Sequence, residues 1–198
     1  MKRFKLCVAA ALISLCSTQM AWAAMPYPFG WYLEGDAGKS VASDKSYPGK
    51  VYNTGFGWGL AGGYKFNEYV AGEVGFTHYA QTRVKTLAGT TFATDEHYSY
   101  DLVGKVILPI AHTGLEIFGK LGVGRIYAYT SLTNPQAANA NGYFINTGVH
   151  SHNALYLGGG AEYAILKNLL ANVQWQRAKG TNQTGDVDLY SAGLAYIF

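Results

Sequence analysis

The chain has 198 residues, of which 49% are hydrophobic, 15% aromatic and 14% charged, and its formal net charge is +3. Lys2, Arg3 and Lys5 supply that excess, so the sequence beyond them carries 12 basic and 12 acidic side chains. Balanced charge without a basic stripe excludes nucleic-acid binding. Cys7 and Cys16 both lie near the start, which excludes a disulfide or zinc scaffold in the remainder.

Residues 1–23 are predicted to be a secretory signal peptide. The apolar run Leu6–Cys16 follows a basic start and is too short to span a bilayer, and the small-x-small motif Ala21–Ala23 comes next. Cleavage is expected after Ala23 or Ala24, and residues 24–198 are expected to form one domain. Export, many aromatic residues and the lack of a long apolar segment together favour a transmembrane β-barrel.

Apolar and polar residues alternate along much of the exported sequence, which is the pattern of β-strands. In chain order, the alternating stretches begin at Gly30, Gly57, Tyr69, Tyr98, Leu115, Asn153, Ala171 and Tyr190. In the clearest stretch, Leu102 and Val106 share one face, whereas Asp101 and Lys105 share the other. The apolar face is expected to meet lipid and the polar face to line the interior.

These stretches predict an all-β fold, an eight-stranded antiparallel transmembrane β-barrel with up-and-down (meander) topology. Connections of two lengths alternate between them. The short ones lie near 66–69, 109–115 and 165–169, and the long ones near 40–55, 80–97, 130–152 and 178–186. Short turns are expected on the periplasmic side, and aromatic rings, such as Trp58 and Tyr79 near the long loops, are expected to form two interfacial belts.

The interior-facing charges form the largest polar group of the predicted barrel. They are Glu34, Asp36, Lys65, Glu73, Asp101, Lys105, Lys120 and Glu162. Residue counting predicts that Glu73 reaches Lys105 and that Lys120 reaches Glu162. Because eight strands enclose a space that side chains fill, a plug of paired charges is the first interpretation. A narrow path for ions or small solutes is the alternative.

The motif His97–Asp101 raises the possibility of an enzyme. His97, Ser99 and Asp101 share one strand face, but consecutive side chains on that face are about 7 Å apart, which is a poor arrangement for a nucleophile and its base. No catalytic residue is therefore assigned. His150 and His152 lack an apparent third ligand, so no metal and no cofactor is expected.

Taken together, "YLEGDAGKS", "EVGFTHY", "DLVGKVILP", "FGKLGVGR" and the terminal "GLAYIF" resemble the OmpA-like outer-membrane β-barrel family of Gram-negative bacteria. The resemblance covers the exported chain and implies location in the cell outer membrane. It also implies assembly by periplasmic chaperones and the barrel-assembly machinery. Unlike the namesake, this sequence stops at its last predicted strand, so a barrel without a periplasmic domain is expected.

The expected function is a non-enzymatic structural or surface-interaction role for a monomeric barrel. A narrow porin-like channel is the alternative, and a lipid A-modifying enzyme is a further one. The last stretch resembles a C-terminal assembly signal carried by Tyr190, Leu194, Tyr196 and Phe198. Arg125 and Arg177 interrupt the outward apolar pattern near the loops. They are expected either to contact lipopolysaccharide phosphates or to turn inward at a local bulge.

Overall fold

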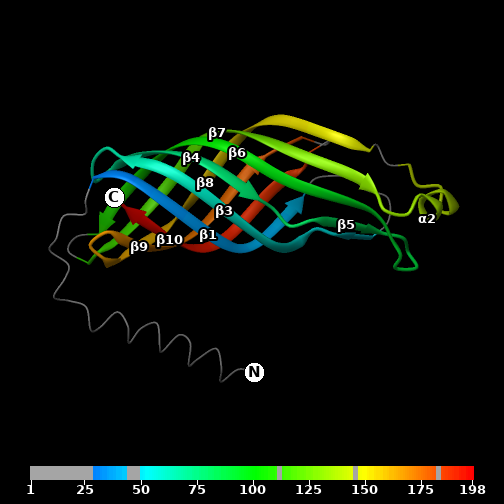
Figure 1. The fold of residues 1–198 in the computed structure, drawn as a ribbon, viewed down its shortest axis with the longest axis horizontal. Coiled ribbons are helices and arrows are strands. Elements are labelled where there is room, and N and C mark those ends of the chain that lie inside the picture. The colour runs from blue at the N-terminus through cyan, green and yellow to red at the C-terminus, as the bar shows by residue number, and fades with distance from the viewer. Residues whose placement is uncertain (1–28, 44–49, 111–112, 145–146, 182–183) are drawn as a thin grey trace, which may run out of the picture.

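The computed structural model describes residues 29–43, 50–110, 113–144, 147–181 and 184–198, which form mainly antiparallel β-strands (Figure 1). The predicted signal peptide and its cleavage site lie outside the described residues. Within them, no helix is both long enough and apolar enough to cross a bilayer.

Eight of the described strands form a closed wall. They are β1 (Gly30–Ser43), β3 (Thr54–Lys65), β4 (Val70–His78), β6 (Thr91–Ile110), β7 (Leu115–Leu132), β8 (Gly148–Leu166), β9 (Leu169–Lys179) and β10 (Asp186–Ile197). All neighbours are antiparallel, and β1 pairs with β10 to close the ring. The predicted barrel is confirmed.

Alternation along each strand separates a lipid-facing surface from the interior. On β6, Leu102 and Val106 are 60% and 66% exposed, whereas Val103 and Ile107, which directly follow them, are buried. Successive side chains point to opposite faces of a strand, so this period of two predicts which residues meet lipid and which fill the barrel.

The barrel interior is filled in three layers. Near the short turns lies an apolar layer of Tyr32, Ala71, Ile107, Phe118, Leu170, Ala195 and Ile197. Near the long connections lies a second layer of Ala42, Tyr79, Val103, Ile126, Ala154, Tyr156, Ala178, Val187 and Leu189. The central charges Glu34, Glu73, Lys105 and Lys120 lie between these layers, whereas Lys65 and Glu116 lie on the short-turn side of the first layer. Tyr79 was predicted for an interfacial belt, but it is fully buried because it points into the interior.

One side of the wall continues far beyond the other, and we call this continuation the extension. It consists of the start of β6, the end of β7 and the start of β8, together with β2 (Lys50–Tyr52) and β5 (Thr82–Lys85), in the strand order β2–β5–β6–β7–β8. Figure 1 shows β5, the start of β6, the end of β7 and the start of β8 reaching past β1, β9 and β10. The expectation of loops near 80–97 and 130–152 is therefore wrong in part, because strands occupy much of both stretches.

A short helix, α2 (Pro135–Ala140), follows β7 at the tip of the extension. Asn134 caps it by accepting a hydrogen bond from the Ala137 amide, and proline in the first turn suits the helix start. The helix packs on a small apolar cluster of Val84, Phe92, Ala93 and Ala138, joined by Leu132, Ala137 and Tyr143. The extension therefore has a hydrophobic core of its own.

Candidate functional site

The barrel interior holds all the charges that the sequence assigns to it. Glu34 and Asp36 come from β1, Lys65 from β3, Glu73 from β4, Asp101 and Lys105 from β6, Lys120 from β7 and Glu162 from β8. Each of these side chains is buried. An uncompensated charge in such a place costs several kcal/mol, so these groups need partners. All of them except Asp36 and Asp101 form an ion pair with another described residue.

Two lysines organise the centre of this network. Lys105 Nζ lies 2.7 Å from Glu162 Oε2 and 3.7 Å from Glu73 Oε1. Lys120 Nζ lies 2.7 Å from Glu73 Oε2 and 3.2 Å from Glu34 Oε1. Glu73 therefore bridges both ammonium groups, and its predicted contact with Lys105 is present.

The predicted contact of Lys120 with Glu162 is replaced by other pairs. Lys105 and Lys120 are register partners on neighbouring strands, so their like charges favour side chains that diverge. Lys105 consequently takes Glu162, while Lys120 takes Glu34 and Glu73. Residue counting along strands does not reveal which of two neighbouring lysines a carboxylate will reach.

Three members of the network were missed as site residues. Glu116 accepts hydrogen bonds from Lys65 Nζ at 3.1 and 2.9 Å, Gln174 donates to Glu34 at 2.8 Å, and the Tyr32 hydroxyl donates to Glu73 at 2.6 Å. The alternation of residues along each strand places all three side chains inward, so this alternation could have identified them. The Tyr32 ring lies against Gly63, where a Cβ atom would clash with Tyr32 Cζ. Glycine at this position makes room for the ring.

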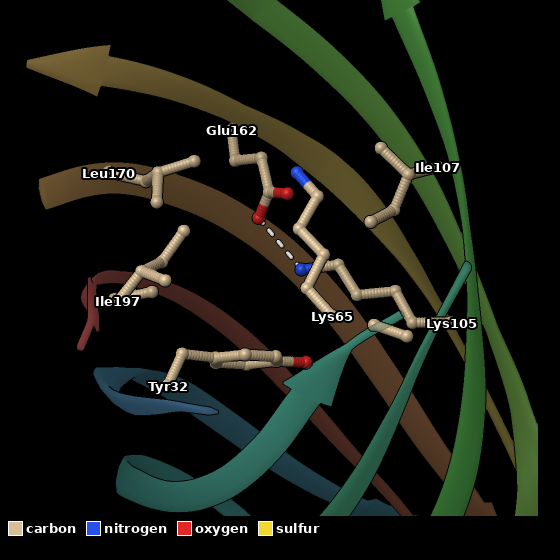
Figure 2. Close-up of a pocket in the computed structure, with 9 residues that line it drawn as sticks. Tyr32, Lys65, Lys105, Ile107, Glu162, Leu170 and Ile197 are labelled. Carbon is tan, nitrogen blue, oxygen red and sulfur yellow. Dashed lines mark hydrogen bonds and ion pairs between the residues drawn. The ribbon is translucent and has the colours of Figure 1, made fainter. Parts of the chain in front are cut away.

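A small cavity adjoins the network near the short turns (Figure 2). It is lined by Tyr32, Lys65, Ala71, Lys105, Ile107, Glu162, Leu170, Ala195 and Ile197. Figure 2 shows the Lys105–Glu162 ion pair and the Lys65 ammonium close to one another, with Ile107, Leu170 and Ile197 around them. The volume of this cavity is about 10 Å³, roughly the room that one water molecule needs. This end of the barrel is therefore occluded.

The motif His97–Asp101 does not form a catalytic triad. His97 Nε2 lies 3.4 Å from Asp95 Oδ2, and the Ser99 hydroxyl lies 3.1 Å from the hydroxyl of Tyr79. His97 and Ser99 are almost completely buried and point into the barrel. An enzyme that modifies lipid must present its nucleophile to the membrane, and this arrangement does not do so.

Arg125 and Arg177 both lie on the outer face, so the alternative of an inward bulge is wrong. The strand register is unbroken at both residues. Arg177 donates to both carboxylate oxygens of Asp188 at 2.8 Å, and Trp175 Nε1 donates to the same carboxylate at 2.9 Å. Arg125 donates to Ser151 at 2.9 Å and lies over the Tyr127 ring. The charge of Arg177 is therefore balanced within the protein.

The last strand presents its proposed signal residues to the outside. Tyr190, Leu194, Tyr196 and Phe198 all lie on the outer face and are between 49% and 72% exposed. The Phe198 amide donates to the Trp31 carbonyl at 2.9 Å, which ties the end of the strand to β1. An outward row of this kind is accessible to another protein before lipid covers it.

No group of three or more histidine, cysteine, aspartate or glutamate side chains is placed to hold a metal ion within the described part of the chain. The chemistry that these residues support is therefore ion pairing inside the barrel and contacts at its outer and distal surfaces.

Comparison with known proteins gives a consistent family assignment. The profile of the family "Outer membrane protein beta-barrel domain" matches residues 8–198. Outer membrane protein A of Salmonella typhi is 26% identical over 211 residues, covering 100% of this chain and 56% of that protein. The chain thus spans little more than half the length of this relative. An uncharacterised protein of Coxiella burnetii is 27% identical, with 85% of each chain covered.

Solved structures share the fold at lower identity. Neisserial surface protein A superposes with a TM-score of 0.62 at 16% identity, covering 85% of this chain and 97% of that one. OprG from Pseudomonas aeruginosa gives 0.62 at 17% identity, covering 87% and 98%. Ail of Yersinia pestis, in complex with the heparin analogue sucrose octasulfate, gives 0.56 at 19% identity, covering 88% and 100%. Each of these likenesses supports the barrel fold.

Proposed function

Because the chain belongs to the outer membrane protein beta-barrel domain family, we propose that it is a non-enzymatic, monomeric barrel of the cell outer membrane with a surface-interaction role. The observation that carries this proposal is the division of the molecule into an occluded barrel and an ordered extension. The barrel supplies the anchor, and the extension supplies the surface that other molecules meet.

The occluded interior favours an anchor over an open pore. Ion pairs cross the centre of the barrel, and an apolar layer lies on either side of them. Eight strands enclose only enough space for side chains, so a solute would have to displace several buried charges to pass. This cost opposes free diffusion through the barrel.

The extension favours an interaction role over a purely structural one. A barrel that only filled the membrane would need no strands beyond it, yet β6 has 20 residues and a spanning strand needs about 9–11. The extra length is stabilised by an apolar cluster that includes Phe92 and Ala138. An ordered surface displayed beyond the membrane is well suited to binding, since fewer groups must be ordered when a partner binds.

A narrow channel is the second candidate, and one observation favours it. Lys105 Nζ lies within 4.0 Å of carboxylate oxygens on Glu34, Glu73 and Glu162, so it has alternative partners. Exchange among them would open a transient path. Planar-bilayer recording of the refolded protein separates the two candidates. The surface role predicts no discrete conductance steps, and reproducible steps that a Lys105→Met variant alters would establish the channel.

The orientation can be tested with single cysteines, since both native cysteines lie in the predicted signal peptide. Leu87 is 71% exposed at the tip of the β5–β6 hairpin, and Lys167 is exposed at the short β8–β9 turn. In intact cells, a membrane-impermeant maleimide should label Leu87→Cys and spare Lys167→Cys. The opposite pattern would place the extension on the periplasmic side and overturn the proposed function.

A further inference from the structure

The extension carries a cluster of basic residues around one aromatic ring, which we call the basic face. It consists of Lys50 and Tyr52 on β2 and Arg83 and Lys85 on β5. Lys50 opposes Lys85 and Tyr52 opposes Arg83 in the antiparallel register, so all four side chains share one side of the sheet. Lys85 Nζ lies 4.6 Å from the centre of the Tyr52 ring.

The basic face continues the lipid-facing surface of the barrel. Arg83 opposes Thr94 on β6. Because strand faces alternate, Thr94 lies on the same side of β6 as Tyr98, Tyr100 and Leu102, which point outward. The basic face therefore looks sideways from the protein, toward whatever surrounds the barrel, and not along its axis away from the cell.

The height of the basic face follows from the same strand. Aromatic rings of β4, β6 and β7, including stacked Tyr98 and Tyr127, mark the level at which lipid meets the aqueous side. Thr94 lies four residues beyond Tyr98 along β6. At about 3.3 Å per residue on a tilted strand, the basic face lies roughly 10–20 Å above that level. In a glycolipid leaflet, phosphorylated headgroup sugars occupy this zone.

The charges of the basic face are available to such groups. None of the ion pairs formed between described residues involves Lys50, Arg83 or Lys85. The nearby acid on this side is Glu96, which accepts a hydrogen bond from Gln81 at 3.0 Å. Arg177 on β9, by contrast, is already paired with Asp188 on β10.

We propose that Lys50, Arg83 and Lys85 bind phosphate groups of the lipopolysaccharide that surrounds the barrel, with Tyr52 packed against a headgroup sugar. The proposal rests on the outer-membrane orientation given above. The guanidinium of Arg83 can hold two phosphate oxygens at once, while the two lysines add point charges. Because the basic face lies on one side of the extension, lipopolysaccharide would bind preferentially on that side of the barrel.

Binding of fluorescently labelled rough lipopolysaccharide that retains its phosphorylated inner-core sugars, to the protein in zwitterionic nanodiscs, tests this. The triple variant K50Q/R83Q/K85Q should bind at least about tenfold more weakly than wild type, because each basic residue near an anionic surface contributes roughly fivefold. The control K39Q/K167Q/K179Q removes three exposed lysines elsewhere and should bind within about twofold of wild type. Enzymatically dephosphorylated lipopolysaccharide should not distinguish the triple variant from wild type.

Two further measurements distinguish lipopolysaccharide in the membrane from a soluble anionic ligand. Soluble heparin should compete poorly, because the basic face lies beside the membrane. Equal affinity of triple variant and wild type for phosphorylated lipopolysaccharide would overturn the proposal, and so would tight heparin binding that the same substitutions abolish. Circular dichroism and the heat-dependent gel mobility of the barrel verify folding. Cysteine labelling tests orientation separately, so failure here leaves the surface role intact.

Discussion

The barrel buries charges between apolar layers and exposes apolar side chains to lipid, whereas the extension buries a purely apolar core, although β6 runs through both. Within the barrel, β6 turns Asp101 and Lys105 inward and exposes Leu102. Beyond the membrane, the same strand buries Phe92 and Ala93 completely. The difference follows from the solvent, because lipid accepts apolar groups on the outside of the barrel, whereas water drives them into a core. Along β6, apolar side chains therefore face outward where lipid surrounds the strand and inward where water does.

Of the changes considered, removing one central charge of the barrel should lower the free energy of unfolding most. Lys105→Met leaves Glu162 and Glu73 without their shared ammonium, so we expect the free energy of unfolding to fall by about 3–5 kcal/mol. Urea unfolding of the refolded barrel, followed by tryptophan fluorescence, measures it. The double variant K105M/E162Q should be more stable than the sum of its single changes predicts. Strict additivity would show that the pair is not coupled.

Truncating the core of the extension should have a smaller and local effect. Phe92→Ala removes a fully buried ring and should destabilise the extension by about 3 kcal/mol, while the urea midpoint of the barrel stays unchanged. Amide hydrogen exchange should accelerate in β5 and α2 and remain slow in β1 and β10. Val106→Ala, on the lipid face, is the control. A shift in the barrel midpoint would mean that the two regions unfold together.

The last aromatic residue should affect assembly more than stability. Phe198 is 72% exposed, so Phe198→Ala should change the stability of the refolded protein by only about 0.5 kcal/mol. We nevertheless expect a severalfold loss of folded protein in the outer membrane of cells, measured by heat-modified gel mobility. Phe56→Ala provides the control, because Phe56 is similarly exposed, at 69%. Equal losses in cells and in detergent would reduce Phe198 to an ordinary packing residue.

The smallest effect is expected for the outer ion pair. The Arg177 side chain is 40% exposed, and neutralising the pair in R177Q/D188N should cost less than about 1 kcal/mol because water and salt screen it. The same urea assay should show less change than for K105M. A loss as large as that of K105M would imply that the outer pair is as poorly solvated as the interior network.

The sequence was sufficient for the barrel and for the polarity of its interior. Alternation along Tyr98–Leu108 reports which side each residue occupies, and that is a local property of the strand. Pairing is not local: Lys120 meets Glu34 across 86 positions, and which of several carboxylates it selects depends on side-chain directions that parity does not encode. Glu116 lay on the correct side but gave no separate signal of its pairing with Lys65.

The strands of the extension were largely not predicted, because in water apolar residues are buried and not displayed on the outer face. Thr91–Glu96 lacks the lipid-facing alternation that identifies the spanning strands, and a bulge between Val84 and Lys85 interrupts the pattern further. Val84 and Phe92 become a core only when α2 covers them. Short strands and a six-residue helix therefore looked like loops when considered alone.

The barrel is closed only when β1 pairs with β10. Tyr32 pairs with Ile197, so the seam joins the first and the last strand of the barrel. Until the final strand arrives, β1 and every later strand in turn present an unpaired edge that could recruit other chains. A partly assembled sheet of this kind is prone to aggregation until β1 and β10 pair.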